Sequence, residues 1–119
     1  MLGTVARGDT LGRILGFPTA NINPHHEVIP SDGIYAVKII LGKNRLKGAC
    51  YIGRRPTIKE KDRKRNVEVH ILNFNRNIYG RLLEIQFVKR IRPDRKFSST
   101  LALKKQIRVD CLSANKFLS

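Results

Sequence analysis

The 119-residue sequence has no tryptophan, one methionine and only two cysteines, Cys50 and Cys111. Two cysteines are too few for the disulfide framework of a small secreted protein, and no CxxC motif or Cys/His cluster suggests zinc. We therefore expect both to be idle thiols in a cytoplasmic protein. No apolar run approaches the ~20 residues needed to span a bilayer. The first residues also lack the basic and apolar blocks of a signal peptide.

Acidic residues are scarce too: nine Asp and Glu stand against 24 Lys and Arg, a formal net charge of +15. Such an excess attracts polyanions, whether nucleic acid, anionic lipid or nucleotide phosphates. One alternative is therefore a basic β-barrel module that binds nucleic acid, with the Lys- and Arg-rich stretch 54–65 as its contact. The five phenylalanines and three tyrosines form no base-stacking motif, which argues against nucleic acid as the partner. Any catalytic carboxylate must be one of the nine.

Glycine and proline divide the first half of the chain into short β-rich segments. We expect strands at 33–41, about 46–52, 66–74 and 82–91, with a hairpin loop at 42–45 and a turn at 75–77. Alternation places the following apolar side chains on one face of their strands: Tyr35, Val37, Ile39, Leu41, Val67, Val69, Ile71, Leu83, Ile85, Phe87 and Ile91.

The last segment changes to a helical period. Ser98 or Ser99 can cap the helix. An apolar stripe at helical spacing follows, and it is typical of core packing: Leu103, Ile107, Cys111, Ala114 and Leu118. Strands without intervening helices favour a closed antiparallel barrel or a sandwich over a parallel sheet. The sequence therefore predicts one mainly β domain that ends in a helix.

The segment Gly12–Asn21 combines an irregular backbone with two oxygen-bearing side chains. If residues 19–21 are extended, Thr19 and Asn21 project from the same face. A hydroxyl beside a carboxamide can hold a hard cation and a phosphate, and nearby glycines let backbone N–H groups approach phosphate oxygens. The spacing matches neither GxGxxG nor a Walker loop. A simple turn, in which Asn21 satisfies backbone donors, is the alternative.

Glu68 differs from the other acids because it lies within a predicted strand, between two valines. A strand holds a carboxylate rigidly, and partial burial would raise its pKa toward a value that suits a general base. Alternation alone favours a solvent-facing side chain, because structural carboxylates outnumber catalytic ones. His70 points the same way and is interpreted as a packing residue. His25 and His26 have no third ligand in view, so we expect no metal there.

Several short motifs occur in a specific order along the chain. Gly3-Thr4-Val5, Gly8-Asp9 and the segment 12–22 with its Pro18-Thr19-Ala20-Asn21 signature are followed by a Gly-x-Arg-Pro-Thr-like turn at 52–57. Further matching segments are 30–37, 68–74, 78–80, 91–93, 96–97 and 106–110. This ordered set resembles the riboflavin kinase (flavokinase) family over nearly the whole chain.

The resemblance implies one riboflavin kinase domain over 1–119, with a six-stranded antiparallel Greek-key barrel over about 1–92 and a C-terminal α-helix over about 98–118. It implies transfer of the γ-phosphoryl group of ATP to the 5′-hydroxyl of riboflavin, giving FMN and ADP, with Mg²⁺ as cofactor. Glu68 would accept the hydroxyl proton, and Thr19 and Asn21 would hold Mg²⁺ and the nucleotide phosphates. The residues implied around the phosphates are Gly8, Gly12, Arg13, Gly16 and Pro18. The expected flavin slot is the barrel mouth beside the helix.

The sequence departs from the family pattern at several positions. Asn73 stands where an acid is common, Tyr51 replaces a smaller polar residue, and the stretch 59–65 is unusually basic. In bacteria this module usually follows an FMN adenylyltransferase domain that we do not recognise here, so an excised module or a single-domain kinase is expected, with that domain as a candidate partner. A degenerate module that binds flavin without turnover is a third interpretation, against which Thr19, Asn21 and Glu68 argue.

Overall fold

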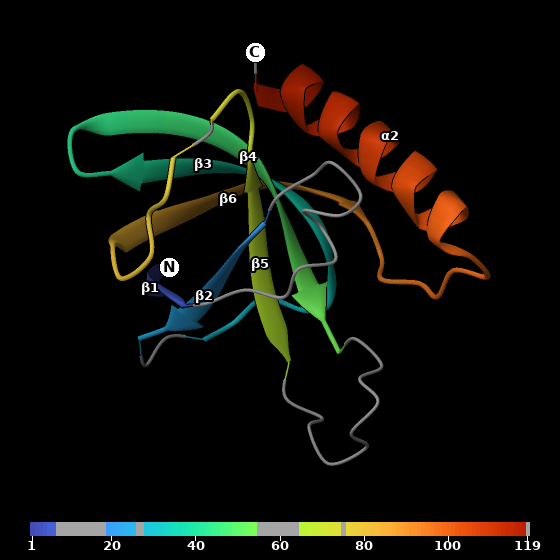
Figure 1. The fold of residues 1–119 in the computed structure, drawn as a ribbon, viewed down its shortest axis with the longest axis horizontal. Coiled ribbons are helices and arrows are strands. Elements are labelled where there is room, and N and C mark those ends of the chain that lie inside the picture. The colour runs from blue at the N-terminus through green and yellow to red at the C-terminus, as the bar shows by residue number, and fades with distance from the viewer. Residues whose placement is uncertain (7–18, 26–27, 55–64, 75, 119) are drawn as a thin grey trace.

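A computed structural model describes residues 1–6, 19–25, 28–54, 65–74 and 76–118 (Figure 1). These residues form six strands and one helix. The elements are β1 (Leu2–Ala6), β2 (Ala20–Pro24), β3 (Gly33–Leu41), β4 (Asn44–Gly53), β5 (Asn66–Ile71), β6 (Leu82–Arg92) and α2 (Thr100–Leu118).

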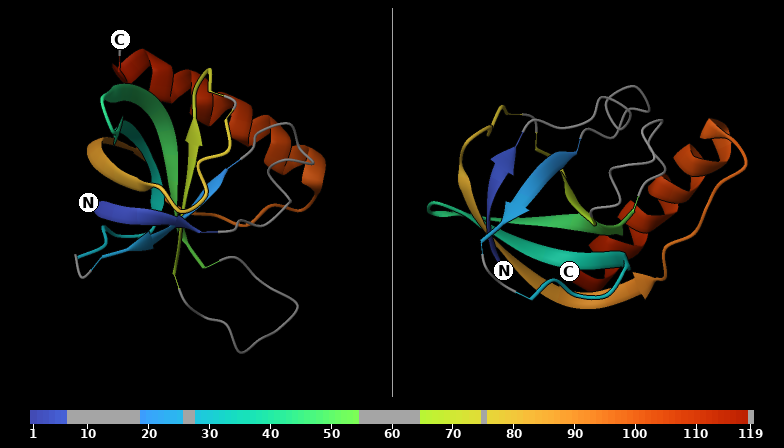
Figure 2. Two further views of the ribbon diagram at one scale, coloured as in Figure 1. Left: turned by 60° about the vertical axis from the view of Figure 1, so that its left-hand side comes forward. Right: turned by 90° about the horizontal axis from the view of Figure 1, so that it is seen from below.

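The six strands close into one antiparallel barrel in the order β1-β2-β5-β4-β3-β6 (Figure 2). Strands β3, β4 and β5 are neighbours in succession, and β6 returns to lie beside β3. This arrangement is a Greek key. Pairing of β1 with β6 closes the barrel, so each of the six described strands has a neighbour on both sides. The predicted mainly β barrel with a terminal helix is therefore confirmed.

The barrel interior is filled by apolar side chains, and these include all of the residues predicted to face inward except Ile91. Its buried members are Val5, Ile22, Tyr35, Val37, Ile39, Leu41, Cys50, Ile52, Val67, Val69, Ile71, Ile78, Leu83 and Ile85. Phe87 packs against the same cluster. Residues between these positions along each strand point to the outside of the barrel, where the candidate site lies.

Helix α2 packs on the outer wall of the barrel, over β3, β4 and β6. A second apolar cluster forms there from Ala36, Ala114 and Leu118, with Ile91 packed against it. The prediction that Ile91 faces the barrel interior is therefore wrong. Two irregularities in the β3–β6 pairing, at Ile34/Tyr35 and Ala36/Val37, interrupt simple alternation before Ile91 is reached.

The start of α2 is capped by Ser99, whose hydroxyl oxygen accepts a hydrogen bond of 3.1 Å from the Ala102 N–H. Of the predicted apolar stripe, Ala114 and Leu118 are buried, whereas the residues nearer the start are only partly buried. Asp110 is the unexpected buried member of the helix. Among the residues that the structure describes, we find no helix with the length and hydropathy of a membrane span.

Two strand boundaries differ from the predicted ones: β4 begins earlier and β5 ends earlier. The β3–β4 hairpin needs only Gly42 and Lys43, with Gly42 at φ 59°, so β4 already begins at Asn44. Strand β5 stops at Ile71 instead of continuing to residue 74. Asn73 there adopts φ 53°, a left-handed conformation that Asn tolerates better than most residues.

Candidate functional site

The barrel closure brings three polar side chains into one row on the outer wall. Asn21 of β2 is directly opposite Glu68 of β5. Tyr51 of β4 is directly opposite Glu68 on the other side. Directly opposed side chains in antiparallel strands have Cβ atoms about 4.5–5.5 Å apart. Glu68 therefore stands between an amide on its β2 side and a phenol on its β4 side.

Thr19, just before β2, also reaches Glu68. Its hydroxyl donates a hydrogen bond of 3.2 Å to Oε1 of Glu68. Because Asn21 is also adjacent to Glu68, the expectation that Thr19 and Asn21 lie on one face agrees with the structure. An extended backbone over residues 19–21 is enough to place Thr19 and Asn21 on one face. The pairing of β2 with β5 explains why both side chains lie beside Glu68.

Glu68 is only 3% exposed although it points away from the barrel interior. The simple interpretation of Glu68 as a solvent-facing carboxylate is therefore wrong. His70, one pleat further along the same outer face, is partly buried opposite Ala49. A buried carboxylate needs hydrogen bonds, and the Thr19 hydroxyl supplies one of them.

Cys50 lies behind this row, inside the barrel and fully buried. Its burial, and secondarily the negative charge of Glu68, raise the pKa of the Cys50 thiol far above its ordinary value. Cys50 is therefore a neutral packing residue, because the thiolate is the reactive form of cysteine.

The remaining predicted site residues are outside the described ranges. These are Gly8, Gly12, Arg13, Gly16 and Pro18. The same holds for His26 and for residues 55–64 of the basic stretch. His25 is described, and its Nε2 lies 2.6 Å from the hydroxyl oxygen of Thr4.

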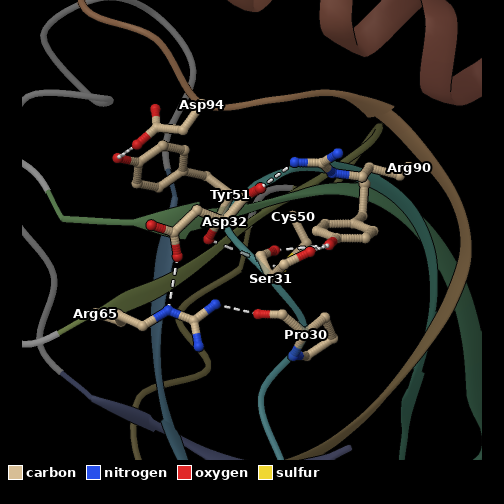
Figure 3. Close-up of polar contacts among 9 residues, drawn as sticks. Pro30, Ser31, Asp32, Cys50, Tyr51, Arg65, Arg90 and Asp94 are labelled. Atoms are coloured by element: carbon tan, nitrogen blue, oxygen red, sulfur yellow. Dashed lines mark hydrogen bonds and ion pairs between the residues drawn. The ribbon is translucent and has the colours of Figure 1, made fainter.

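Sequence reasoning missed a second polar contact beside the site, between Tyr51 and Asp94 (Figure 3). The Tyr51 hydroxyl donates to Oδ2 of Asp94 at 3.2 Å. Asp94 belongs to the connection between β6 and α2. The available signal was Tyr51 itself, because a large phenol stands there in place of a smaller side chain.

An ion pair joins the residues that directly precede β3 and β5. Nε of Arg65 lies 2.6 Å from Oδ1 of Asp32, and a second nitrogen of Arg65 binds the Pro30 carbonyl (Figure 3). Arg90 donates to the Asp32 carbonyl at 2.6 Å. Asp32 therefore joins β3 to β5 and β6. These contacts could not be predicted from the sequence, because the partners are far apart along the chain.

The donors around Glu68 suit a hard divalent cation. Hydroxyl, carboxamide and carboxylate oxygens are ligands that Mg²⁺ accepts, and Mg²⁺ commonly keeps substrate phosphates and waters as its other ligands. Within the described residues, no group of three or more His, Cys, Asp or Glu side chains gathers as a metal site. Thr19 and Asn21 place a hydroxyl and a carboxamide beside Glu68, a set of oxygen donors that could hold such a cation.

A cavity of about 250 Å³ lies away from this site, near the β3–β4 hairpin. It is lined by Lys38, Ile39, Ile40, Arg45, Leu46, Lys47, Gln86 and Leu118. Lys47 precedes Tyr51 by four residues, about 13 Å along an extended strand. The cavity is therefore separate from the row that contains Glu68.

Comparison with known proteins gives one consistent family. The family model for flavokinase, described as riboflavin kinase, matches residues 1–118. A bifunctional riboflavin kinase/FMN adenylyltransferase of Haemophilus influenzae is 42% identical over 120 residues, covering 100% of this chain and 38% of that protein. The protein of the same description from Bacillus subtilis is 39% identical over 119 residues, covering 98% of this chain and 38% of its own length. The chain thus spans little more than a third of these relatives.

A solved structure shares the fold. The crystal structure of a macrolide-efflux protein from Streptococcus pneumoniae has a TM-score of 0.81 and 32% sequence identity. The similarity covers 92% of this chain and 36% of that chain. The shared part is therefore one portion of a longer protein.

Proposed function

Since the chain belongs to the riboflavin kinase family, we propose that it transfers the γ-phosphoryl group of ATP to the 5′-hydroxyl of riboflavin. The products are FMN and ADP. The observation that supports this most directly is the contact between Thr19 and Glu68, with Asn21 on the paired strand directly opposite the acid. It brings a candidate base within reach of a candidate cation site.

Glu68 is the proposed general base. Its carboxylate accepts the proton of the riboflavin hydroxyl as the oxygen attacks the γ-phosphorus, and the bond from that phosphorus to the ADP oxygen breaks. The rigid strand β5 keeps the carboxylate in one place. The Thr19 hydroxyl bond restrains its rotamer further.

Thr19 and Asn21 are the residues proposed to hold Mg²⁺ and the nucleotide phosphates. When bound, the cation would neutralise charge that develops on the phosphate oxygens. The proposed phosphate cradle also includes Gly8, Gly12, Arg13, Gly16 and Pro18. Glycines there would admit backbone N–H groups to the phosphates, and the Arg13 guanidinium would add positive charge.

The proposal extends to compartment and partner. Both cysteines are free, which suits a reducing cytoplasm. An FMN adenylyltransferase domain, as named in the relatives, is the partner that would consume the FMN product.

The first experiment is a direct assay. The purified protein is incubated with ATP, MgCl₂ and riboflavin, and FMN is measured by chromatography. We expect FMN to form in step with ADP. Riboflavin binding without FMN would instead support the degenerate module, and neither binding nor turnover would contradict the proposed function.

The second experiment tests the proposed base. Glu68→Gln keeps the shape of the side chain and removes its ability to accept a proton, so we expect kcat to fall at least about 100-fold. Glu84→Gln on β6 is the matched control and should retain activity. Denaturant unfolding checks that both variants are folded. Full activity of Glu68→Gln would remove Glu68 from the mechanism.

A further inference from the structure

The row on the outer wall has two chemically different sides. Asn21 and Thr19 approach Glu68 from the β2 side and carry the oxygen donors suited to the cation and phosphates. Tyr51 flanks Glu68 on the β4 side and carries a large aromatic ring. If Glu68 is the base, the acceptor alcohol must reach it without displacing the donor phosphates, so the β4 side is left for the acceptor.

The Tyr51 ring is held in a defined position. Its hydroxyl binds the Asp94 carboxylate at 3.2 Å, a contact between residues 43 apart in sequence. Gly53, two positions further on the same strand face, makes room for this bond. A Cβ at Gly53 would collide with both the Tyr51 hydroxyl and the Asp94 carboxylate. Glycine at position 53 therefore leaves the space in which Tyr51 and Asp94 form their hydrogen bond.

Asp94 lies on a segment that is anchored at both ends. Before it, Arg92 binds Asp110 of α2 through two nitrogens, at 2.9 and 2.8 Å. After it, Arg95 donates to Gln106 of α2 at 3.0 Å. These contacts attach the β6–α2 connection, residues 93–99, to the helix. The Tyr51 bond attaches the same connection to the strand next to Glu68.

Phe97 stiffens this connection. The guanidinium groups of Arg92 and Arg95 lie 5.6 and 4.9 Å from the centre of its ring, within the range of cation–π attraction. These contacts brace the connection against α2, and the bond between Tyr51 and Asp94 joins it to β4.

We propose that Tyr51 and Asp94 are positioning residues for the acceptor substrate. Their hydrogen bond holds the β6–α2 connection against β4 and so sets the width of the space on the acceptor side of Glu68. This inference rests on the proposed function, because it takes Glu68 as the base. It assigns the pair no part in proton transfer and no contact with the ATP phosphates.

The test compares single and double variants. Tyr51→Phe keeps the ring and removes the hydroxyl, and Asp94→Ala removes the acceptor. Each should weaken riboflavin binding about five- to tenfold, as expected for loss of one hydrogen bond to a charged group. Asp94→Asn retains an acceptor oxygen and should restore most of the affinity. The double variant should be no worse than either single variant, because both remove the same bond.

The readouts separate this role from a purely structural one. Riboflavin affinity is measured by quenching of flavin fluorescence, and KM is measured for both substrates. We expect the KM for riboflavin to rise and the KM for ATP to stay within about twofold. Tyr79→Phe, at an exposed tyrosine on the β5–β6 connection, is the matched control and should change neither.

Each outcome distinguishes the two ideas. Unchanged riboflavin affinity in Tyr51→Phe, or equal changes in both KM values, overturns the positioning role even if the enzyme makes FMN. Weakened flavin binding in Tyr51→Phe and Asp94→Ala, in a protein that makes no FMN, supports the pair's role and contradicts the proposed function instead.

Discussion

At the scale of single residues, the carboxylates differ in the groups that surround them. Asp32 is paired with Arg65, and Asp110 is paired with Arg92. Both are thereby committed to joining elements of the fold. Glu68 differs because its neighbours are a hydroxyl, an amide and a phenol. Of these carboxylates it is the one placed beside candidate cation ligands, which is why the proposed chemistry centres on it.

The two thiols give a prediction at the same scale. Burial, and secondarily the negative charge of Asp110, raise the pKa of Cys111 to about 11. Only the thiolate reacts, so roughly one molecule in a thousand is reactive at Cys111 at pH 8. Alkylation by iodoacetamide should therefore be slow in the native protein and should accelerate about tenfold per pH unit between pH 7 and 9.

A comparison with urea-unfolded protein completes this experiment. There both cysteines should react at the rate of an ordinary thiol. Cys111→Ser, which leaves only the fully buried Cys50, should show almost no labelling while folded. Rapid labelling of the folded wild type at pH 7 would contradict the raised pKa values.

At the scale of elements, an apolar cluster and the ion pair between Arg92 and Asp110 join α2 to the barrel. The side chains of Arg92 and Asp110 are only 15% and 5% exposed. Gln106 adds a hydrogen bond of 3.0 Å to Oδ1 of Asp110. Removing one member of such a pair leaves the other charge with little water and no partner. The helix, and with it the connection that carries Asp94, therefore depends on this contact.

Asp110→Ala should lower the free energy of unfolding by about 3 kcal/mol, because the Arg92 guanidinium is left unpaired. Urea unfolding followed by circular dichroism measures the change. Lys105→Ala on the exposed side of the same helix is the control and should change stability by no more than about 0.5 kcal/mol. Replacing both partners, Arg92→Met with Asp110→Leu, should recover much of the lost stability. Wild-type stability of Asp110→Ala would show that the ion pair is dispensable.

At the scale of the whole molecule, the dominant property is the net charge of +15. A protein with such a charge attracts polyanions, because binding releases their counterions. The affinity of this kind of binding falls steeply as the salt concentration rises. The family assignment does not favour the nucleic-acid interpretation. Any binding of nucleic acid is therefore expected to come from the net charge and to lack sequence preference.

We expect affinity for a short DNA duplex to fall at least about tenfold between 50 and 200 mM salt, with no preference among sequences. Riboflavin carries no net charge at neutral pH, so its affinity should change less than about twofold over the same range. Fluorescence anisotropy and flavin quenching measure the two. Salt-resistant, sequence-selective DNA binding would revive the nucleic-acid interpretation.

The predictions that held depend on local patterns. Alternating residues such as Val67, Val69 and Ile71 identify a strand because its side chains alternate between faces. The predictions that failed depend on distant contacts. Ile91 lies under α2 because of irregular pairing with β3, and Glu68 is buried because residues of β2 and β4 flank it.

The sequence by itself determined the family, the mainly β class, the terminal helix and the identity of Thr19, Asn21 and Glu68 as candidates. These follow from local periodicity and from ordered motifs. Only the tertiary structure decided that Asn21 and Tyr51 flank Glu68 and that Asp94 reaches Tyr51. The register between strands that are far apart in sequence is set by closure of the barrel and burial of its interior, and no local pattern specifies it.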